Sequence, residues 1–259
     1  MARQAPQEAS SEQKIDYLGF QAAVGVTKHD GGSKATNELI ELCQIGKDKH
    51  VLEIGCGTGR TACLLTKKHD CTVVAIDISE KMLDWSKERA REERVESKIA
   101  FRVADATNLP FEDNTFDAVI CESVLAFVRN KQKAIDECVR VTKTGGYVGL
   151  NESTWIVPPP AELVEHFSST AERQAEILTP DGWKQLMENA GLREIVVRSY
   201  KLSFLGLFFD RIRLIGLKRI LRAWYLIITN PTYRSAIKEM QTPKNIYDYW
   251  GYGIYVGRK

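Results

Sequence analysis

Short apolar segments alternate with amphipathic segments along most of the chain. Apolar runs rich in β-branched residues predict strands at residues 50–54, 72–77, 99–103, 116–122 and 147–153. Between them, apolar residues at helical spacing predict helices at residues 58–69, 79–93 and 130–142. A helix at 179–192 and strands at 193–200 and 251–259 follow. Strands that alternate with helices predict a doubly wound sheet of mostly parallel strands.

Several side chains indicate where the helices begin and end. A first helix is expected near Ser33, with Ser33 as its cap, and Ser79 is the expected cap of the helix at 79–93. Gly145–Gly146 is expected to stop the helix before the fifth strand. Thr179 and the proline after it open the helix at 179–192, and Gly191 closes it.

The composition is that of an ordinary globular protein. The chain has 259 residues, of which 44% are hydrophobic and 27% are charged, enough for one large domain with a full core. The net charge is only +2, so we expect no nucleic-acid partner. The opening residues Met1–Gln13 are polar and show no export signal, which favours a cytoplasmic protein.

Six cysteines are scattered along the chain without a Cys-x-x-Cys pair. They are Cys43, Cys56, Cys63, Cys71, Cys121 and Cys138. A structural zinc site needs close pairs of Cys or His, so we expect no metal. Free, buried thiols in a reducing compartment fit this spacing better.

Three glycines follow the first predicted strand in the stretch HVLEIGCGTGRTACLL. In a doubly wound sheet, ligands bind beyond the carboxyl ends of the strands, where the strand order reverses. Glycine allows positive φ there and lets a ligand approach the backbone. Asp77 ends the second strand and is placed to accept hydrogen bonds from a ribose, while Asp105 and Ala106 follow the third strand, beside an adenine. We therefore predict a nucleoside ligand.

The spacing of the glycines separates two nucleoside cofactors. A dinucleotide fingerprint reads Gly-x-Gly-x-x-Gly, but the third position counted from Gly55 is Arg60. The pattern is instead Gly-x-Gly-x-Gly, preceded by Glu53. No Lys-Ser or Lys-Thr follows, which excludes a phosphate-binding P-loop.

Four motifs stand in order along the chain: VLEIGCGTG, VVAIDIS, VADATNLPFEDNTFDAVIC and GGYVGLNE. Together they resemble the class I S-adenosylmethionine-dependent methyltransferases, most of all the small-molecule branch with ubiquinone/menaquinone-type and sterol-type enzymes. The resemblance covers residues 31–191 and the final YGIYVGRK segment. It implies a Rossmann-like, seven-stranded sheet in a three-layer αβα arrangement, with an antiparallel last strand next to the sixth. It also implies S-adenosyl-L-methionine as the cofactor.

The resemblance implies a role for each matching residue. The glycines approach the methionyl part of the cofactor, Glu53 orders that end, and Asp77 holds the ribose. Ile78 packs on the adenine, whose edge faces Asp105. The expected cofactor-binding residues are Tyr17 as a covering aromatic, Glu53, Gly55, Cys56, Gly57, Gly59, Asp77, Ile78, Asp105, Ala106 and, through its backbone, Glu122.

Transfer of a sulfonium methyl group is an in-line displacement that depends mainly on positioning and on the exclusion of water. A base is needed only if the acceptor loses a proton. The candidates are Glu152 at the end of the fifth strand, His166 after it, and His29 before the first helix. The Asn-Pro-Pro-Tyr and Pro-Cys motifs of amide, adenine and cytosine methylation are missing, which favours a small organic, lipophilic acceptor.

Two other functions stay open at this point. An NAD(P)-dependent oxidoreductase would share the sheet, although Arg60 argues against it. A non-catalytic nucleoside-binding module would keep the cofactor site and transfer nothing.

Residues 203–250 form a basic and apolar insert between the last two strands, within a core of residues 31–202 and 251–259. Residues 1–30 are expected to be a tail and a cofactor-covering segment. Within the insert, residues 204–231 hold one acid, Asp210, and five basic residues: Arg211, Arg213, Lys218, Arg219 and Arg222. Charges interrupt every long apolar run, so the insert cannot span a bilayer. A plain helix packed on the sheet, a lid over the acceptor pocket, a subunit contact and peripheral membrane contact through residues 204–228 all stay open. The oligomeric state stays open.

Overall fold

The computed structural model describes residue 21 and residues 29–169, 175–202, 217–231, 234 and 244–259. At residues 166–169, 217–220 and 244–245 it describes the backbone alone. Expectations for Tyr17 and for residues 203–216 therefore lie outside the described residues.

Helices and strands alternate as the sequence pattern predicts. The helices are α2 (Gly32–Leu42), α3 (Arg60–His69), α4 (Glu80–Glu93), α5 (Lys131–Val141), α6 (Ala161–Ser169), α7 (Pro180–Asn189) and α9 (Leu217–Thr229). The strands are β1 (His50–Ile54), β2 (Thr72–Asp77), β3 (Ile99–Val103), β4 (Phe116–Glu122), β5 (Thr142–Trp155), β6 (Arg193–Lys201) and β7 (Trp250–Arg258). Short 3-10 helices span Glu96–Lys98, Leu125–Phe127 and Lys244–Asp248.

In the described residues the strands form one seven-stranded sheet with the order β3-β2-β1-β4-β5-β7-β6. Strands β1 to β5 pair in parallel, whereas β7 runs antiparallel to both β5 and β6. This confirms the predicted fold class, including the antiparallel last strand. The strand order reverses between β1 and β4, so their carboxyl ends open onto the ligand-binding edge of such a sheet.

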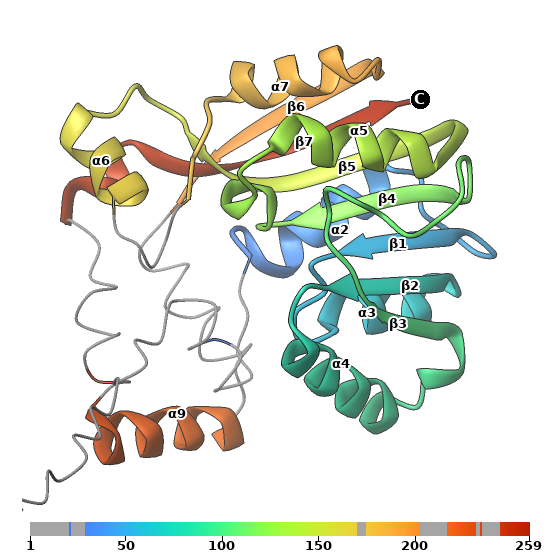
Figure 1. The fold of residues 1–259 in the computed structure, drawn as a ribbon, viewed down its shortest axis with the longest axis horizontal. Helices are drawn as coiled ribbons and strands as arrows, with labels where there is room; N and C mark the ends of the chain where they lie inside the picture. The colour runs from blue at the N-terminus through green and yellow to red at the C-terminus, as the bar shows by residue number, and fades with distance from the viewer. Residues whose placement is uncertain (1–20, 22–28, 170–174, 203–216, 232–233, 235–243) are drawn as a thin grey trace, which may run out of the picture.

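Helices cover both faces of the sheet, and alternate side chains of each strand feed the two cores (Figure 1). On β1, Val51 faces the core under α2, α3 and α4, while Leu52 and Ile54 face the core under α5 and α7. All three are at most 2% exposed. A strand buried on both faces needs a nearly continuous apolar run, which is what made β1 recognisable in the sequence.

Two predicted helix ends differ in the structure. Helix α2 begins after Gly31, not Ser33, because Gly31 adopts a left-handed φ of 77° and a side chain there would collide with Tyr252. Ser33 instead accepts a hydrogen bond from Arg60 at 2.8 Å. Helix α5 ends at Val141, before the glycine pair, because Thr142 already pairs with Phe116 at the start of β5. The caps at Ser79 and Thr179 are confirmed.

The cysteines agree with the sequence prediction. All six lie within the described residues, buried and free. Burial raises the pKa of each of these thiols; that of Cys71 rises to about 11. They are therefore protonated core side chains.

Candidate active site

The turn from β1 to α3 is built on left-handed glycines. Gly55, Gly57 and Gly59 have φ values of 70°, 54° and 73°, which other residues adopt only with strain. A side chain on Gly55 would collide with Val124, and one on Gly59 would lie 2.9 Å from the Cα atom of Ser86. Protein packing alone therefore requires glycine at Gly55 and Gly59, a reason that the sequence did not reveal.

Asp77, at the carboxyl end of β2, holds this turn in place. One carboxylate oxygen accepts the Gly57 N–H at 2.9 Å, and the other accepts the Ser79 N–H at the same distance. Burial raises the pKa of Asp77, and these amide bonds partly offset the effect. A carboxylate oxygen can accept more than one hydrogen bond, so Asp77 keeps acceptor capacity toward the edge of the sheet.

An apolar surface lies next to Asp77 at the ends of β2 and β3. Ile78, which follows β2, is 69% exposed, and Val103, which ends β3, is 47% exposed. Asp105 is exposed as well, and its Oδ1 atom accepts hydrogen bonds from the Thr107 N–H and hydroxyl at 2.7 and 2.8 Å. Ala106 is buried. The structure thus brings the predicted ribose and adenine residues to one edge.

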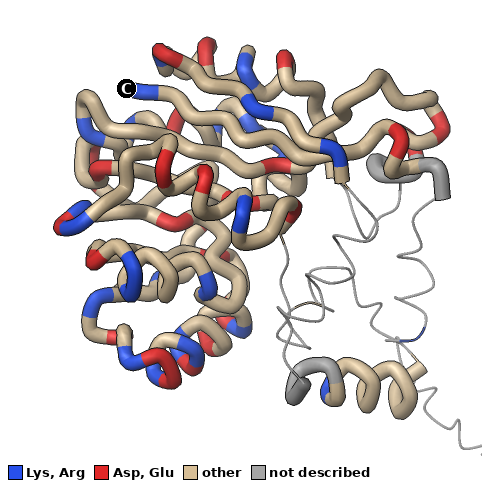
Figure 2. Tube along the Cα trace, turned by 180° about the vertical axis from the view of Figure 1, so that it is seen from behind, with Lys and Arg blue, Asp and Glu red and all other residues tan. Residues whose placement is uncertain are grey.

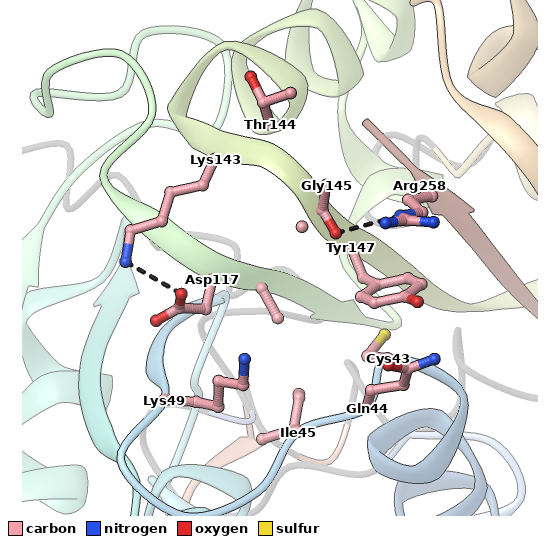
Figure 3. Close-up of a pocket in the computed structure, with 12 residues that line it drawn as sticks. Cys43, Gln44, Ile45, Lys49, Asp117, Lys143, Thr144, Gly145, Tyr147 and Arg258 are labelled. Atoms are coloured by element: carbon pink, nitrogen blue, oxygen red, sulfur yellow. Dashed lines mark hydrogen bonds and ion pairs between the residues drawn. The ribbon is translucent and has the colours of Figure 1, made fainter.

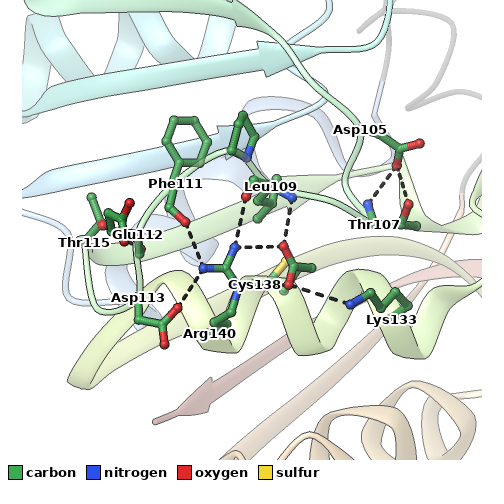
Figure 4. A network of polar contacts seen from close by, with 12 residues as sticks. Asp105, Thr107, Leu109, Phe111, Glu112, Asp113, Thr115, Lys133, Cys138 and Arg140 are labelled. Atoms are coloured by element: carbon green, nitrogen blue, oxygen red, sulfur yellow. Dashed lines mark hydrogen bonds and ion pairs between the residues drawn. The ribbon is translucent and has the colours of Figure 1, made fainter.

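A partly buried ion-pair network holds the loop that carries Asp105 (Figure 4). The Arg140 guanidinium donates to the carbonyl oxygens of Leu109 and Phe111 at 2.9 and 2.8 Å. It also pairs with Glu137, whose carboxylate accepts the Leu109 N–H at 2.8 Å. Arg140 also pairs with the exposed Asp113 of the same loop at 2.8 Å, so the loop is held through its backbone and through one side chain.

Glu53, near the end of β1, carries an unsatisfied acceptor. The side chain is 5% exposed, and its Oε2 atom has no hydrogen-bond partner. Burial raises the pKa of Glu53 well above its usual range, and the nearby Glu122 and Asp77 add to the effect. A buried acceptor without a donor is costly, so this position suits a ligand that brings a cation or an N–H group.

Glu122, at the end of β4, is the centre of a polar cluster. Its side chain is only 7% exposed. It accepts hydrogen bonds from Thr61 at 2.9 Å, Thr36 at 3.0 Å and Asn151 at 3.2 Å. The sequence predicted a role for the backbone of Glu122 and missed this use of its side chain. These contacts join residues that are far apart in the chain. In the sequence, the one sign of them is Asn151, a polar residue within an apolar strand.

His29 lies against the same cluster. Its Nδ1 atom is 3.4 Å from Glu122 Oε2, and its Nε2 atom is 3.3 Å from the Thr36 hydroxyl. The side chain is 17% exposed. Both ring nitrogens therefore face protein groups, and the side chain is not fully buried.

Glu152 is placed differently from the other candidate base. It is fully buried at the end of β5, and its carboxylate accepts the N–H groups of Val124, Leu125 and Ala126 at 3.0, 2.8 and 3.3 Å. Burial raises its pKa to about 7, and the three amides act against this rise. The carboxylate is thus directed at the backbone of the loop after β4. His166 lies in α6, and its side chain is outside the described residues, as is Tyr17.

Comparison with known proteins identifies the family. A family model described as a methyltransferase domain matches residues 52–150, the stretch from β1 into β5. The chain belongs to the class I S-adenosylmethionine-dependent methyltransferases. The ubiquinone/menaquinone and sterol branch stays a prediction.

Three similar proteins show the range of this family. A Haemophilus influenzae protein described as uncharacterized is 30% identical over 232 residues, 87% of this chain and 92% of its own length. The 27-O-demethylrifamycin SV methyltransferase of Amycolatopsis mediterranei is 27% identical over 68% of this chain and 65% of its own. Phosphoethanolamine N-methyltransferase 2 of Haemonchus contortus, solved with S-adenosyl-L-methionine, superposes with a TM-score of 0.74 at 19% identity. That match covers 93% of this chain and 56% of the other, and it shows the fold.

S-adenosylmethionine is the cofactor of this methyltransferase family, and the described residues fit it. The unpartnered Glu53 carboxylate suits its ammonium group, Asp77 suits its ribose, and the exposed Ile78 suits its adenine. Among the described residues, no cluster of His, Cys, Asp and Glu side chains is arranged to hold a metal ion.

We expect Asp77→Ala to weaken binding of S-adenosylhomocysteine by about 1–3 kcal/mol, because charged hydrogen bonds to the ribose are lost. Asp84→Ala, an exposed acid on the neighbouring helix α4, is the matched control. Calorimetric titration of both variants checks this. An unchanged dissociation constant for Asp77→Ala would remove Asp77 from the site.

Glu152 predicts a pH dependence of stability. Its folded-state pKa of about 7 exceeds the ordinary value of 4.5, so the folded state binds the proton more tightly. Stability should therefore fall as pH rises from about 4.5 to about 7, by at most about 1.4 kcal/mol per pH unit. Urea unfolding of wild type and Glu152→Gln at several pH values isolates this contribution. Parallel pH profiles of the two proteins would contradict it.

Proposed function

We propose that this protein transfers the methyl group of S-adenosylmethionine to a small, lipophilic organic acceptor. The observation that carries the cofactor half of this proposal is the unpartnered, buried Glu53 carboxylate beside a turn anchored by Asp77. When bound, the cofactor supplies an activated sulfonium methyl group. The protein then needs chiefly to orient the acceptor in line and to exclude water.

The acceptor half rests on apolar and aromatic side chains beyond the carboxyl end of the sheet. There β5 and β7 continue as a pair to Trp155 and Trp250. Trp155, Leu163, Ile177 and Ile246 form a buried cluster of their own, against which Tyr247, Tyr249 and Trp250 pack while partly exposed. Val157 and Val164 nearby in the chain are 39% and 44% exposed. An acceptor with an apolar body would gain buried area against such a surface.

The relatives do not decide the acceptor. Their printed names specify two different ones, demethylrifamycin SV and phosphoethanolamine. This chain spans 65% and 56% of those two proteins, so their substrates are no guide by themselves. The apolar surface of this chain favours an acceptor without a charged head group.

If the acceptor must lose a proton, we propose that His29 takes it. Of the described candidate bases, the His29 side chain is 17% exposed, whereas Glu152 is fully buried and enclosed by backbone amides. The Glu122 carboxylate beside the ring would stabilise a protonated imidazole. His166 stays a prediction.

Peripheral membrane contact through residues 204–228 is the second part of the proposal. In α9, Leu221, Trp224, Tyr225 and Ile228 are 60–65% exposed, and their spacing places them on one face. Figure 2 shows the described part of α9 almost without charge, in contrast to the alternating charges of α4. Exposed aliphatic and aromatic residues next to a basic segment are typical of helices that lie in a membrane interface.

A contact with α4 sets the orientation of α9. The Arg222 guanidinium lies over the Trp85 ring, 5.0 Å from its centroid, which is cation–π geometry. Arg222 is itself exposed, so this contact joins one flank of α9 to α4 and leaves the apolar stripe exposed. Within the described residues, none of the helices is both long and apolar enough to cross a bilayer.

Methyl transfer is tested with cofactor labelled in its methyl group and a metabolite extract divided into organic and aqueous phases. We expect protein-dependent label in the organic phase, reduced by Asp77→Ala. Label found only in the aqueous phase would contradict the lipophilic acceptor. Binding of S-adenosylhomocysteine with no label transfer to either phase would favour the non-catalytic binding module.

Membrane contact is tested by flotation with vesicles of phosphatidylcholine and phosphatidylglycerol. We expect wild type to float with the vesicles, and the triple variant Leu221→Ser, Trp224→Ser, Ile228→Ser to stay in the bottom fraction, because the apolar stripe is gone. Val196→Ser, an exposed apolar residue on β6, is the control. Equal flotation of all three proteins would refute the role of α9, and a dimer that the triple variant abolishes would assign the stripe to a subunit contact.

A further inference from the structure

A cavity of about 240 Å³ opens at the amino ends of β4 and β5. It lies between the end of α2, the segment that leads into β1, the start of β5 and the end of β7 (Figure 3). Parallel strands β1, β4 and β5 send their carboxyl ends to the opposite edge of the sheet, where the glycine turn lies. The cavity is therefore separate from the proposed cofactor site.

Positive charge predominates around this cavity. Lys49, Lys143 and Arg258 line it, and Asp117 is the acid among the lining residues. Asp117 is already engaged, because one oxygen accepts the His50 N–H at 2.8 Å and the other pairs with Lys143 at 3.0 Å. Burial alone would raise the pKa of Asp117, but these two contacts, together with the nearby charge of Lys49, hold it below its ordinary value. Asp117 and Lys143 thus neutralise each other.

The other two cations keep donor capacity. No hydrogen bond or ion pair joins the Lys49 ammonium to another described residue, and Figure 3 shows the side chain extended beside the cavity. Arg258 donates through Nε to the Gly145 carbonyl at 3.3 Å and pairs through Nη1 with the exposed Glu194 at 3.6 Å. A surface pair of that length is weak, and the Nη2 atom remains for a ligand.

The walls of the cavity offer a surface for an apolar body. Ile45, Cys43 and Ala118 form buried lining, and the Tyr147 ring is partly exposed among them. Gln44 also lines the cavity and adopts a left-handed φ of 49° at the end of α2, a position where glycine is favoured. Asp70 and Arg94 adopt the same conformation after α3 and α4, so the backbone of Gln44 follows from the helix end, and its amide is one of the polar groups at the cavity.

We propose that this cavity binds a small organic anion, with its carboxylate or phosphate group between Lys49 and Arg258. The apolar body of the ligand lies on Tyr147 and Ile45, and Gln44 supplies a further polar contact. Arg and Lys are the side chains best suited to these head groups, and two of them on facing elements bind one anion together. The site makes no use of the cofactor edge, so it stands independently of the proposed methyl transfer.

Calorimetric titration of the full chain, loaded with S-adenosylhomocysteine, tests the site. The probes are phenyl phosphate, benzoate, inorganic phosphate and the neutral benzyl alcohol. We expect saturable binding of phenyl phosphate, benzoate or both, and none of benzyl alcohol. Binding of only one anion identifies the head group. If inorganic phosphate binds as tightly as phenyl phosphate, the apolar part of the ligand contributes nothing and that part of the proposal is wrong. If neither organic anion binds, the proposed site is refuted.

Charge reversal locates the binding. We expect Lys49→Glu to raise the dissociation constant of the bound probe by about tenfold or more, since attraction becomes repulsion. Lys49→Arg should retain binding. The control is Lys47→Glu, an exposed lysine two residues away that does not line the cavity. Equal effects of Lys49→Glu and Lys47→Glu would show a general effect of charge and overturn the proposal. Affinity for S-adenosylhomocysteine serves as the separate readout of an intact cofactor site.

Discussion

The Asp77 carboxylate joins the turn after β1 to the turn after β2, and the arrangement of the whole cofactor edge depends on this junction. Parallel strands bring several loops to one edge of the sheet. The hydrogen bonds between the strands do not, however, fix these loops to each other. Two acids near strand ends and a serine of α4 fix the loops here. Asp77 binds two loop amides, Ser86 donates to the Gly57 carbonyl at 2.8 Å, and Glu152 gathers three amides after β4. The edge is therefore held by acids that are largely removed from water.

These acids also give the edge its electrostatic character. Glu122 lies close enough to Glu53 to raise the pKa of the Glu53 carboxyl group, and Asp77 adds to this rise. No arginine or lysine pairs with any of the three in the described residues. A ligand with positive charge at its centre relieves this repulsion, whereas a negatively charged ligand would increase it. The charges at this edge therefore favour a positively charged ligand, apart from any single hydrogen bond.

The sequence predicted the strands well and its candidate cofactor residues do lie at one edge of the sheet, because both depend on local signals. Apolar runs of five to seven residues marked β1 to β4 with their observed ends, and the spacing of Gly55, Gly57, Gly59 and Asp77 pointed to one edge. What it missed depends on contacts between distant residues. Thr36 and Asn151 reach Glu122 from α2 and β5, and Val124 and Ser86 impose glycine at Gly55 and Gly59. No local pattern reports such neighbours, and for the same reason Ser33 looked like a cap when Gly31 begins the helix.

The place of β7 in the sheet has a consequence for how the protein acquires its fold. β7 lies between β5 and β6, although both of these strands precede it in the chain and α9 intervenes. Until β7 inserts, β5 and β6 each present an open row of backbone donors and acceptors that another molecule can occupy. Closing this gap brings together distant segments, which is a slow step in folding. Newly made chains are therefore most exposed to self-association before that insertion, and the yield of native protein should depend on chain concentration and on chaperones that shield strand edges.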